Sequence, residues 1–141
     1  MEWNNRMLLA AVIGWASAQF LKVLLDFIRT KHISFDRFVG SGGMPSSHTA
    51  FVIALVTSVG KYTGINNAAF AIAAAFALVT MYDATGVRRA AGEQAKILNY
   101  MMDNWKNAPQ MFQKNLKELI GHTPLEVIAG AFLGLGIGLL V

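Results

Sequence analysis

Residues 40–49 read Gly-Ser-Gly-Gly-Met-Pro-Ser-Ser-His-Thr and lead directly into the apolar stretch 49–59. This junction joins a glycine-rich loop to Pro45 and Ser46, residue types that favour the start of a helix. The first turn of a helix has N–H groups without intrahelical partners, and the helix dipole adds positive potential there. Such a junction binds anions, phosphate above all, and His48 can transfer protons near pH 7. The stretch therefore predicts a phosphate site at the beginning of an apolar helix.

The apolar residues fall into four long blocks. The chain is 55% hydrophobic and 14% charged, whereas an average soluble domain is about 25% charged. About 20 residues of apolar helix, and about 17 at the least, cross the hydrocarbon core of a bilayer. A small soluble all-helical protein is the alternative, but blocks this long and uncharged are rare in soluble cores. We predict a single all-α integral membrane domain, 1–141, with four transmembrane helices at about 7–28, 45–61, 66–83 and 124–141.

The segment 88–120 alternates charged and apolar residues at helical spacing, which predicts a basic amphipathic helical segment at the membrane interface. This segment and the connection after the first helix together hold nine basic residues, against Arg6 and Lys61 on the opposite side. The positive-inside rule then places the face with the phosphate site in the cytoplasm and both termini outside. We expect an integral protein of a bacterial cell membrane, although cations that serve as phosphate ligands would count less as topology signals.

Several kinds of site or partner are not expected. The chain has no cysteine, which excludes disulfides and thiolate sites. No basic patch is interleaved with aromatic residues, so nucleic acid is not an expected partner. The spacing of His48, Asp83, His122 and Glu126 matches no common zinc pattern, so no metal site is expected.

Three charged residues lie within the first apolar block or at its end. Lys22 and Arg29 are seven residues apart and therefore share one helical face. Charges inside a membrane helix are costly and usually face a polar interior or a partner. Either Lys22 pairs with Asp26 and Arg29 anchors the helix at the interface, or both cations bind phosphate. Both interpretations are open from the sequence.

His122 and Glu126 are four residues apart, so the carboxylate can hold the imidazole in one tautomer and make it a better nucleophile. The run Thr123-Pro124-Leu125-Glu126 also has the pattern of a helix capping box. Capping alone would account for Glu126. The two roles are compatible, because each places Glu126 beside His122 at the start of a helix.

Two further patterns each have two interpretations. Arg88 and Arg89 directly follow the third apolar block and are either interface anchors or bidentate phosphate ligands. Glycines spaced four apart in the last block allow close approach of a second helix, either within the bundle or in a homodimer; they are Gly130, Gly134 and Gly138.

Three blocks of this sequence resemble a known superfamily. They are Lys22-x6-Arg29, then Pro45-Ser46-Ser47-His48, then His122-x3-Glu126. They resemble the signature blocks of the type 2 phosphatidic acid phosphatase superfamily, which includes bacterial acid phosphatases and vanadium haloperoxidases. The wider run through Tyr82-Asp83-Ala84-x-Gly86-Val87-Arg88-Arg89 and Gly121-His122-Thr123-Pro124 is similar to its divergent small membrane branch. The resemblance spans nearly the whole chain.

The resemblance implies a phosphohistidine mechanism without metal or other cofactor. His122 would attack phosphorus, Glu126 would orient it in place of the usual aspartate, and His48 would protonate the leaving oxygen. Phosphate ligands are expected among Lys22, Arg29, Gly43, Ser46, Ser47, Arg88 and Arg89.

The chain departs from the superfamily pattern at three positions. Thr30 stands where proline is usual, and Ser47 replaces the glycine of Pro-Ser-Gly-His. Leu116, with Lys117 beside it, stands where the third block has an arginine, so Arg88 or Arg89 would have to supply that charge. These changes bear on turnover more than on phosphate binding.

The function expected from the sequence is hydrolysis of a phosphomonoester or pyrophosphate on a polyprenyl or phosphatidyl lipid. The alternative is a membrane protein that binds a phospholipid or phosphorylated ligand without turnover, as a carrier, transporter subunit or scaffold. In both cases the partners are a lipid phosphate and membrane lipids.

Overall fold

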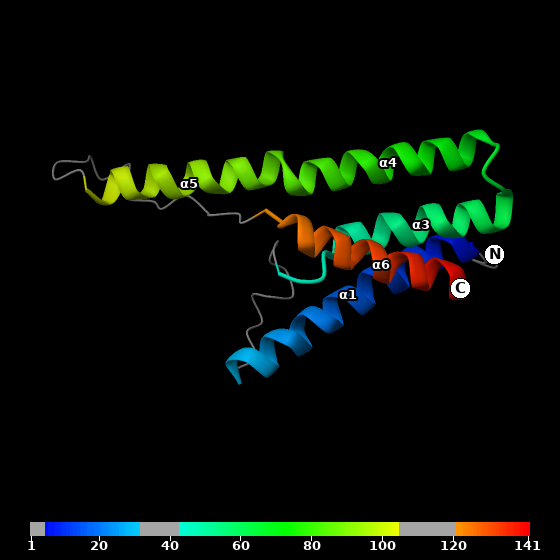
Figure 1. The fold of residues 1–141 in the computed structure, drawn as a ribbon, viewed down its shortest axis with the longest axis horizontal. Coiled ribbons are helices and arrows are strands. Elements are labelled where there is room, and N and C mark those ends of the chain that lie inside the picture. Colours follow the sequence, from blue (N-terminus) through cyan, green and yellow to red (C-terminus); the bar gives the residue numbers. More distant parts are fainter. Residues whose placement is uncertain (1–4, 32–42, 105–120) are drawn as a thin grey trace.

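The computed structural model describes residues 5–31, 43–104 and 121–141, which are helical apart from short caps and turns (Figure 1). Within these ranges there is no β-strand, so the predicted all-α class is confirmed. The helices of the described ranges are α1 (Arg6–Thr30), α3 (Ser47–Thr63), α4 (Ala68–Thr85), α5 (Val87–Asp103) and α6 (Pro124–Leu140).

Polar residues placed at the helix ends determine where most of these helices begin. Asn5 caps α1 by accepting from Leu8 N–H at 3.1 Å, and Asn67 caps α4 by accepting from Phe70 N–H at 2.9 Å. The turn from α3 to α4 passes through Gly64, whose φ of 82° lies in the left-handed region that favours glycine. Short caps and a tight turn thus make α3 and α4 antiparallel neighbours.

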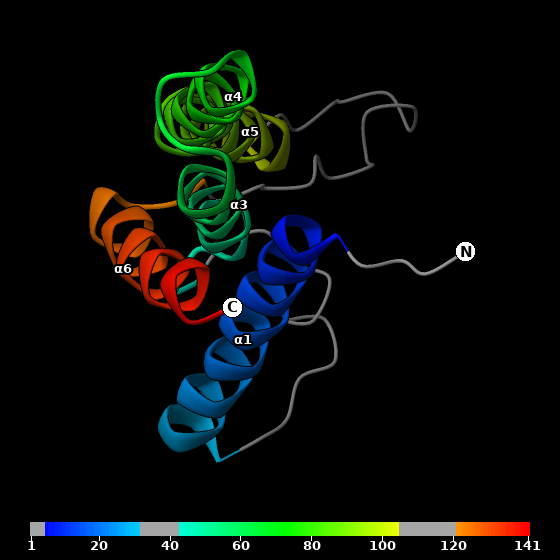
Figure 2. The same cartoon turned by 90° about the vertical axis from the view of Figure 1, so that its right-hand side faces the viewer.

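Helix α3 is the centre of the bundle, with α1, α4 and α6 packed around it (Figure 2). Its contact with α1 depends on small residues, because a side chain at Gly14 would come within 2.9 Å of Ala50 O. The buried face of α1 repeats every four residues through Ala10, Gly14 and Ala18, and the next residue of that face is Lys22. The packing face of α1 therefore leads directly to a buried cation.

The three glycines of α6 pack against α3 inside the same chain. A Cβ at Gly130 would lie 2.4 Å from Ser46 O, one at Gly134 2.6 Å from Ala50 O, and one at Gly138 2.6 Å from Thr57 Cβ. These glycines therefore serve packing within the bundle, the first of the two interpretations. The homodimer stays a prediction.

Hydrogen bonds close the end of the bundle that carries the C-terminus. Tyr62 Oη donates to Val141 O at 2.6 Å, and Arg6 donates to Tyr62 Oη at 3.5 Å. Lys61 Nζ donates to Leu139 O at 2.9 Å. These contacts join α1, α3 and α6 at one end, whereas α1 diverges from the other helices toward its own C-terminal end (Figure 2).

The exterior of the bundle is apolar. Large side chains such as Phe20, Ile72 and Phe132 are about two-thirds exposed or more, at 67%, 70% and 71%. Among the residues that the structure describes, two stretches are long and apolar enough to cross a membrane, Arg6–Thr30 and Ala68–Asp103, and Pro124–Leu140 is a shorter apolar helix. Small residues inside and large apolar residues outside are the arrangement expected of helices packed in lipid.

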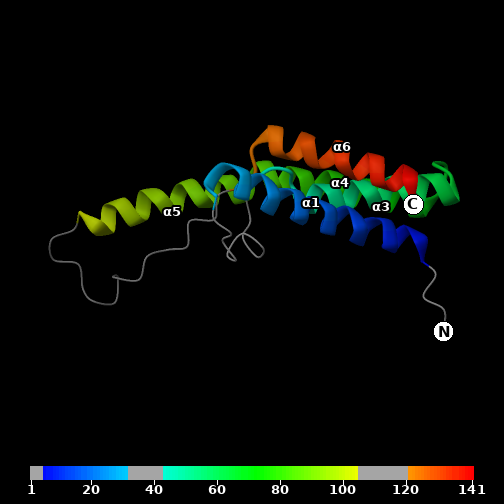
Figure 3. The same ribbon diagram turned by 90° about the horizontal axis from the view of Figure 1, so that it is seen from below.

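Helix α5 continues nearly along the direction of α4 and extends beyond the rest of the bundle (Figures 1 and 3). The combined stretch has 36 residues, about 54 Å at 1.5 Å per residue, against about 30 Å of hydrocarbon core. The sequence predicted an amphipathic helix at the interface; α5 is amphipathic and continues α4, and its place at the interface stays a prediction. Residues 105–120, the rest of that predicted segment, lie outside the described ranges.

Candidate functional site

The candidate residues that the structure describes gather at the open end of the bundle, away from the C-terminus (Figures 1 and 3). This end is formed by the last turns of α1, the start of α3, the junction of α4 with α5 and the start of α6. Because α3 and α6 both begin here, the N-terminal ends of two helix dipoles point toward the same region.

His122 and Glu126 form a close pair at the start of α6. His122 Nδ1 lies 3.1 Å from Glu126 Oε2, and His122 is 3% exposed. The same Oε2 atom accepts from Thr123 N–H at 3.0 Å, and Thr123 Oγ1 accepts from Glu126 N–H at 3.4 Å. The predicted capping box is therefore present, and it sets the carboxylate beside the imidazole. His122 itself precedes the helix.

The backbone of His122 is held by the end of α4. His122 N–H donates to Ala84 O at 3.0 Å. The preceding Gly121 packs against the backbone of Arg89, where a Cβ would lie 2.4 Å from Arg89 N. Only glycine permits this approach, so Gly121 brings the imidazole against the α4–α5 junction.

The Pro-Ser-Ser-His junction is joined to the start of α6 through the backbone. Ser46 N–H donates to Glu126 O at 3.0 Å. Gly130, one turn further along α6, allows the close approach to Ser46 O described above. The second and third sequence blocks, far apart in the chain, are therefore in direct contact.

The side chains at the start of α3 have different environments. Ser46 is fully buried, and its Oγ accepts from Thr49 N–H at 3.4 Å and from Thr49 Oγ1 at 3.0 Å. Its hydroxyl thus caps α3, and the phosphate contact expected of Ser46 stays a prediction. Ser47 is buried as the first residue of α3, whereas His48 is exposed.

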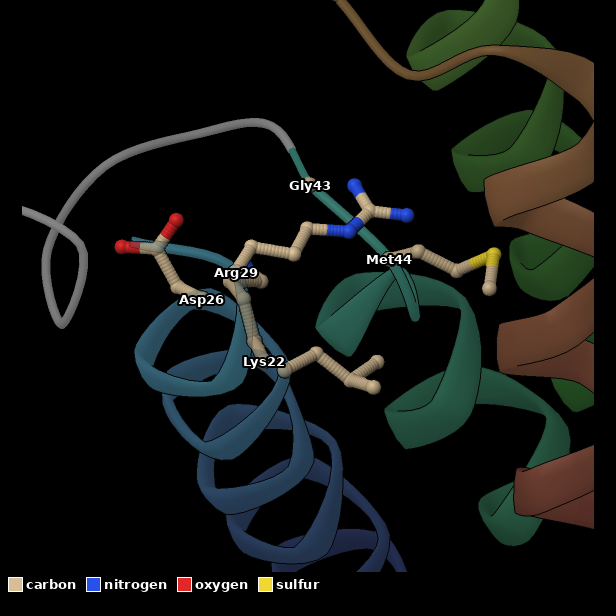
Figure 4. Close-up of a pocket in the computed structure, with 6 residues that line it drawn as sticks. Lys22, Asp26, Arg29, Gly43 and Met44 are labelled. Carbon is tan, nitrogen blue, oxygen red and sulfur yellow. The ribbon is translucent and has the colours of Figure 1, made fainter. Parts of the chain in front are cut away.

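A cavity of about 150 Å³ lies between the last turns of α1 and the glycine loop (Figure 4). The Arg29 guanidinium extends toward the loop at Gly43 and Met44, while the Asp26 carboxylate points the other way. Residues of the described ranges that line the cavity are Lys22, Leu25, Asp26, Arg29, Gly43 and Met44.

Lys22 and Gly43 give this cavity its form. Lys22 is 4% exposed, although lysine is almost never fully buried unless it is paired. Gly43 has a φ of 86°, and a Cβ there would lie 3.5 Å from Lys22 Cγ. The left-handed backbone turns the loop over the lysine stem. The structure therefore brings Lys22, Arg29 and Gly43 together in one cavity; their role as phosphate ligands stays a prediction.

The histidines lie outside the lining of this cavity. Among the described residues that line it there is neither His48 nor His122. The segment 43–46 connects the cationic cavity to the His122–Glu126 pair through the Ser46–Glu126 backbone bond. The arrangement is thus two adjoining groups of residues, one cationic and one with the histidine–carboxylate pair.

The remaining candidates are only partly described. Arg89 is exposed on α5, and the side chain of Arg88 lies outside the described part of the structure. Leu116 and Lys117, at the position of the expected third-block arginine, also lie outside it. The sequence did not identify the carbonyl groups of Ala84 and Glu126 as anchors, because any residue supplies a carbonyl; Gly121 beside His122 was the one available signal.

A helical bundle with an apolar exterior, and with histidine, carboxylate and cationic groups at one end, defines a membrane-type protein with a polar site at one face. The chain belongs to the divergent PAP2 family, whose model matches residues 3–137. It is 41% identical over 143 residues to the uncharacterized membrane protein YuiD of Bacillus subtilis (strain 168). That match covers 94% of this chain and 90% of the relative. No solved structure matches the chain. The resemblance predicted from the three sequence blocks is confirmed.

Proposed function

We propose that this protein is a membrane phosphatase that hydrolyses a lipid phosphomonoester or pyrophosphate, on a polyprenyl or phosphatidyl lipid, without a metal ion. The observation that carries the proposal is the buried His122 with Nδ1 3.1 Å from Glu126 Oε2, in contact through the backbone with the Pro-Ser-Ser-His junction. Family membership supports a relationship to phosphatases.

The hydrogen bond to Glu126 sets the tautomer that the proposal requires. A carboxylate only accepts hydrogen bonds, so the neutral imidazole donates from Nδ1 and keeps its lone pair on Nε2. Nε2 is thereby the nucleophile, and the carboxylate stabilises the positive charge that develops on the ring. The 3% exposure of His122 means that substrate reaches Nε2 by displacing the residues that cover it.

The proposed reaction has two steps. In the first, His122 Nε2 forms a bond to phosphorus, the bond to the leaving oxygen breaks, and protonated His48 gives that oxygen its proton. In the second, neutral His48 takes a proton from water, the resulting oxygen attacks phosphorus, and the P–N bond breaks to release phosphate. The Nδ1 proton stays on the bond to Glu126 throughout.

The cations and loop amides at the open end are the proposed phosphate ligands. Lys22, Arg29 and the loop at Gly43 share one cavity, and fixed cations stabilise the charge that develops during phosphoryl transfer. Ser47, Arg89 and the backbone of Arg88 lie at the same end of the bundle. In this proposal α1, α3, α4 and α6 all cross the membrane and the site faces the cytoplasm of a bacterial cell.

Phosphate release by the purified protein tests the proposal. In detergent with EDTA, we expect release from at least one lipid phosphate of a polyprenyl and phosphatidyl panel, inhibition by vanadate and no release by His122→Ala. A requirement for a divalent metal, or full activity of His122→Ala, would contradict the mechanism.

A second function, binding without turnover, is favoured by one observation. The cationic cavity has neither histidine among its described lining residues, so an anion could be held there without contact to His122. If purified wild-type protein binds phosphate but releases none, and Arg29→Ala abolishes binding while His122→Ala does not, this second function is correct.

A further inference from the structure

Helix α5 is joined to α4 through a bend at Gly86. The φ and ψ of Gly86, −102° and −86°, lie outside the helical range. Helical hydrogen bonds are present on both sides of it, because Gly86 N–H donates to Tyr82 O at 2.9 Å and Gly86 O accepts from Ala90 N–H at 2.9 Å. No side chain caps the start of α5. Helices commonly change direction at a glycine, so this bend is a natural pivot between α4 and α5.

The segment that carries His122 is attached on both sides of this bend. His122 N–H donates to Ala84 O at 3.0 Å, on the α4 side. Gly121 packs against the first turn of α5, where an added Cβ would lie 2.4 Å from Arg89 N and 2.6 Å from Arg89 Cα. A change in the direction of α5 relative to α4 therefore changes the surroundings of His122, which is buried.

Helix α5 has an apolar side and a charged side. At about 100° per residue, one arc of the helix contains four exposed apolar residues, which we call the apolar stripe: Val87, Ile97, Leu98 and Met101. Gln94 is the one polar residue within that arc. The opposite side holds the charged residues Arg89, Glu93, Lys96 and Asp103. A helix with such a division is suited to the boundary between lipid and water.

The start of α5 coincides with the membrane face in the proposed orientation. Helix α4 has 18 residues, about 27 Å at 1.5 Å per residue, which is close to the roughly 30 Å hydrocarbon core. In Figure 3, α5 continues nearly along α4 and extends away from the bundle. In that direction the apolar stripe would lie in water, which is unfavourable. Lipid is the favoured partner, because the exposed apolar residues Val79 and Tyr82 of α4 lead directly to Val87.

We propose that α5 pivots at Gly86 onto the surface of the bilayer through its apolar stripe, and that this movement withdraws Arg89 from Gly121 and opens access to His122. The inference rests on the proposed function, because His122 is the proposed nucleophile. It makes phosphate release depend on contact between α5 and lipid. The burial of His122 belongs to the arrangement in which α5 continues α4.

Spin labels test the lipid contact without any need for turnover. The chain has no cysteine, so Leu98→Cys and Tyr100→Cys would each carry one nitroxide in phosphatidylcholine nanodiscs. Both positions are exposed, the first in the apolar stripe and the second on the charged side. We expect the label at 98 to collide more with oxygen, which dissolves in lipid, and the label at 100 to collide more with a water-soluble nickel chelate.

Two results of this measurement would overturn the proposal. Preference for the nickel chelate at both positions would place the whole of α5 in water. Shielding of the label at 98 from both reagents would indicate a protein partner or a second copy of the chain in place of lipid.

Chemical modification of His48 and His122 tests the access. His48 is exposed, so its labelling by diethyl pyrocarbonate serves as the internal reference. In nanodiscs, Leu98→Glu places a charge in the apolar stripe, and the matched control Tyr100→Glu places the same charge on the charged side. Because labelling of His122 follows the open fraction, we expect it to slow at least about tenfold in Leu98→Glu and to stay at the wild-type rate in Tyr100→Glu. Equal rates in Leu98→Glu and wild type would overturn the coupling.

Phosphate release from butyl phosphate, which is soluble in water, separates this inference from the proposed function. We expect Leu98→Glu to lose at least about tenfold in kcat/KM and Tyr100→Glu to match wild type. Unchanged release by Leu98→Glu, or equal losses in the two variants, would overturn the inference. If wild type releases phosphate from no substrate, the proposed phosphatase function fails, and the two labelling experiments still decide whether α5 binds lipid and governs access to His122.

Discussion

At the scale of single residues, one carboxylate oxygen has two partners. Glu126 Oε2 accepts from Thr123 N–H at 3.0 Å and lies 3.1 Å from His122 Nδ1. The bond to Thr123 belongs to the helix cap and the contact with His122 to the proposed chemistry. If an amide oxygen replaced this carboxylate oxygen, it would still accept the hydrogen bond from Thr123 N–H. It would support His122 poorly, because it lacks the charge that stabilises an imidazolium.

Replacement of Glu126 therefore separates the two roles. In Glu126→Gln we expect a change of less than about 1 kcal/mol in the free energy of unfolding and a fall of at least about 100-fold in phosphate release. In the control Thr123→Ala, the cap hydroxyl that accepts from Glu126 N–H is lost, so stability should fall by about 1 kcal/mol with release nearly unchanged. Equal activity of Glu126→Gln and wild type would mean that Glu126 is only a cap.

Gly43 is the other residue whose identity follows from its conformation. Its φ of 86° is strained for any L side chain, while the nearest atom to an added Cβ, Lys22 Cγ, lies at an ordinary 3.5 Å. We expect Gly43→Ala to cost about 1–2 kcal/mol through the backbone and to raise the Kd for vanadate by up to about tenfold. Gly136→Ala, where an added Cβ has no neighbour within 4 Å, should leave the Kd unchanged. A Gly43→Ala protein with wild-type stability and affinity would refute this account.

At the scale of elements, the spacing of small residues decides which helices touch. Gly130, Gly134 and Gly138 set one face of α6 against α3, and Gly14 sets α1 against the same helix. Hydrophobic attraction between helices is weak in lipid, so close packing is the main source of association. The same contacts place the start of α6 against the start of α3, and hence Glu126 against Ser46.

Two leucine substitutions on α6 test this packing. At Gly134 a Cβ would lie 2.6 Å from Ala50 O, whereas Gly136 has open space. We expect Gly134→Leu to lower the free energy of unfolding in detergent by at least about 1–3 kcal/mol and to weaken phosphate binding, because it separates the two helix starts. Gly136→Leu should be close to wild type in both measurements. Similar effects of the two substitutions would show that the α3–α6 contact is less tight than the structure indicates.

At the scale of the whole molecule, the two ends of the bundle differ. One end is closed by bonds among Arg6, Lys61, Tyr62 and the last residues of α6. The other end holds the cationic cavity and the His122–Glu126 pair, and α5 extends from it (Figure 1). In the proposed orientation this second end faces the cytoplasm, which is what the positive-inside rule predicts from the asymmetry of basic residues.

The absence of cysteine from the sequence makes this orientation straightforward to measure. Single cysteines would be introduced at Gln94 on α5 and at Ile65 in the α3–α4 turn, both exposed. In intact cells, we expect a membrane-impermeant maleimide to label Ile65→Cys and to label Gln94→Cys only after the membrane is opened. The reverse pattern would place the site outside the cytoplasm.

The sequence by itself determined the features that depend on neighbouring residues. The all-α class and the starts of α3 and α6 follow from apolar block length and local caps, and the His122–Glu126 pair follows from a four-residue spacing. The family could be predicted from three short blocks for the same reason. Each of these signals lies within a few turns of helix, where geometry is set by the backbone.

Only the tertiary structure decided which distant segments meet. It placed the glycines of α6 against α3 and joined Ser46 to Glu126. It set Lys22 and Arg29 beside Gly43 in a cavity whose described lining residues do not include His48 or His122. It also showed that α5 continues nearly along the direction of α4 (Figure 1). These contacts run through backbone carbonyls and small residues, which look alike wherever they occur in a sequence, so their partners are determined only when the helices pack.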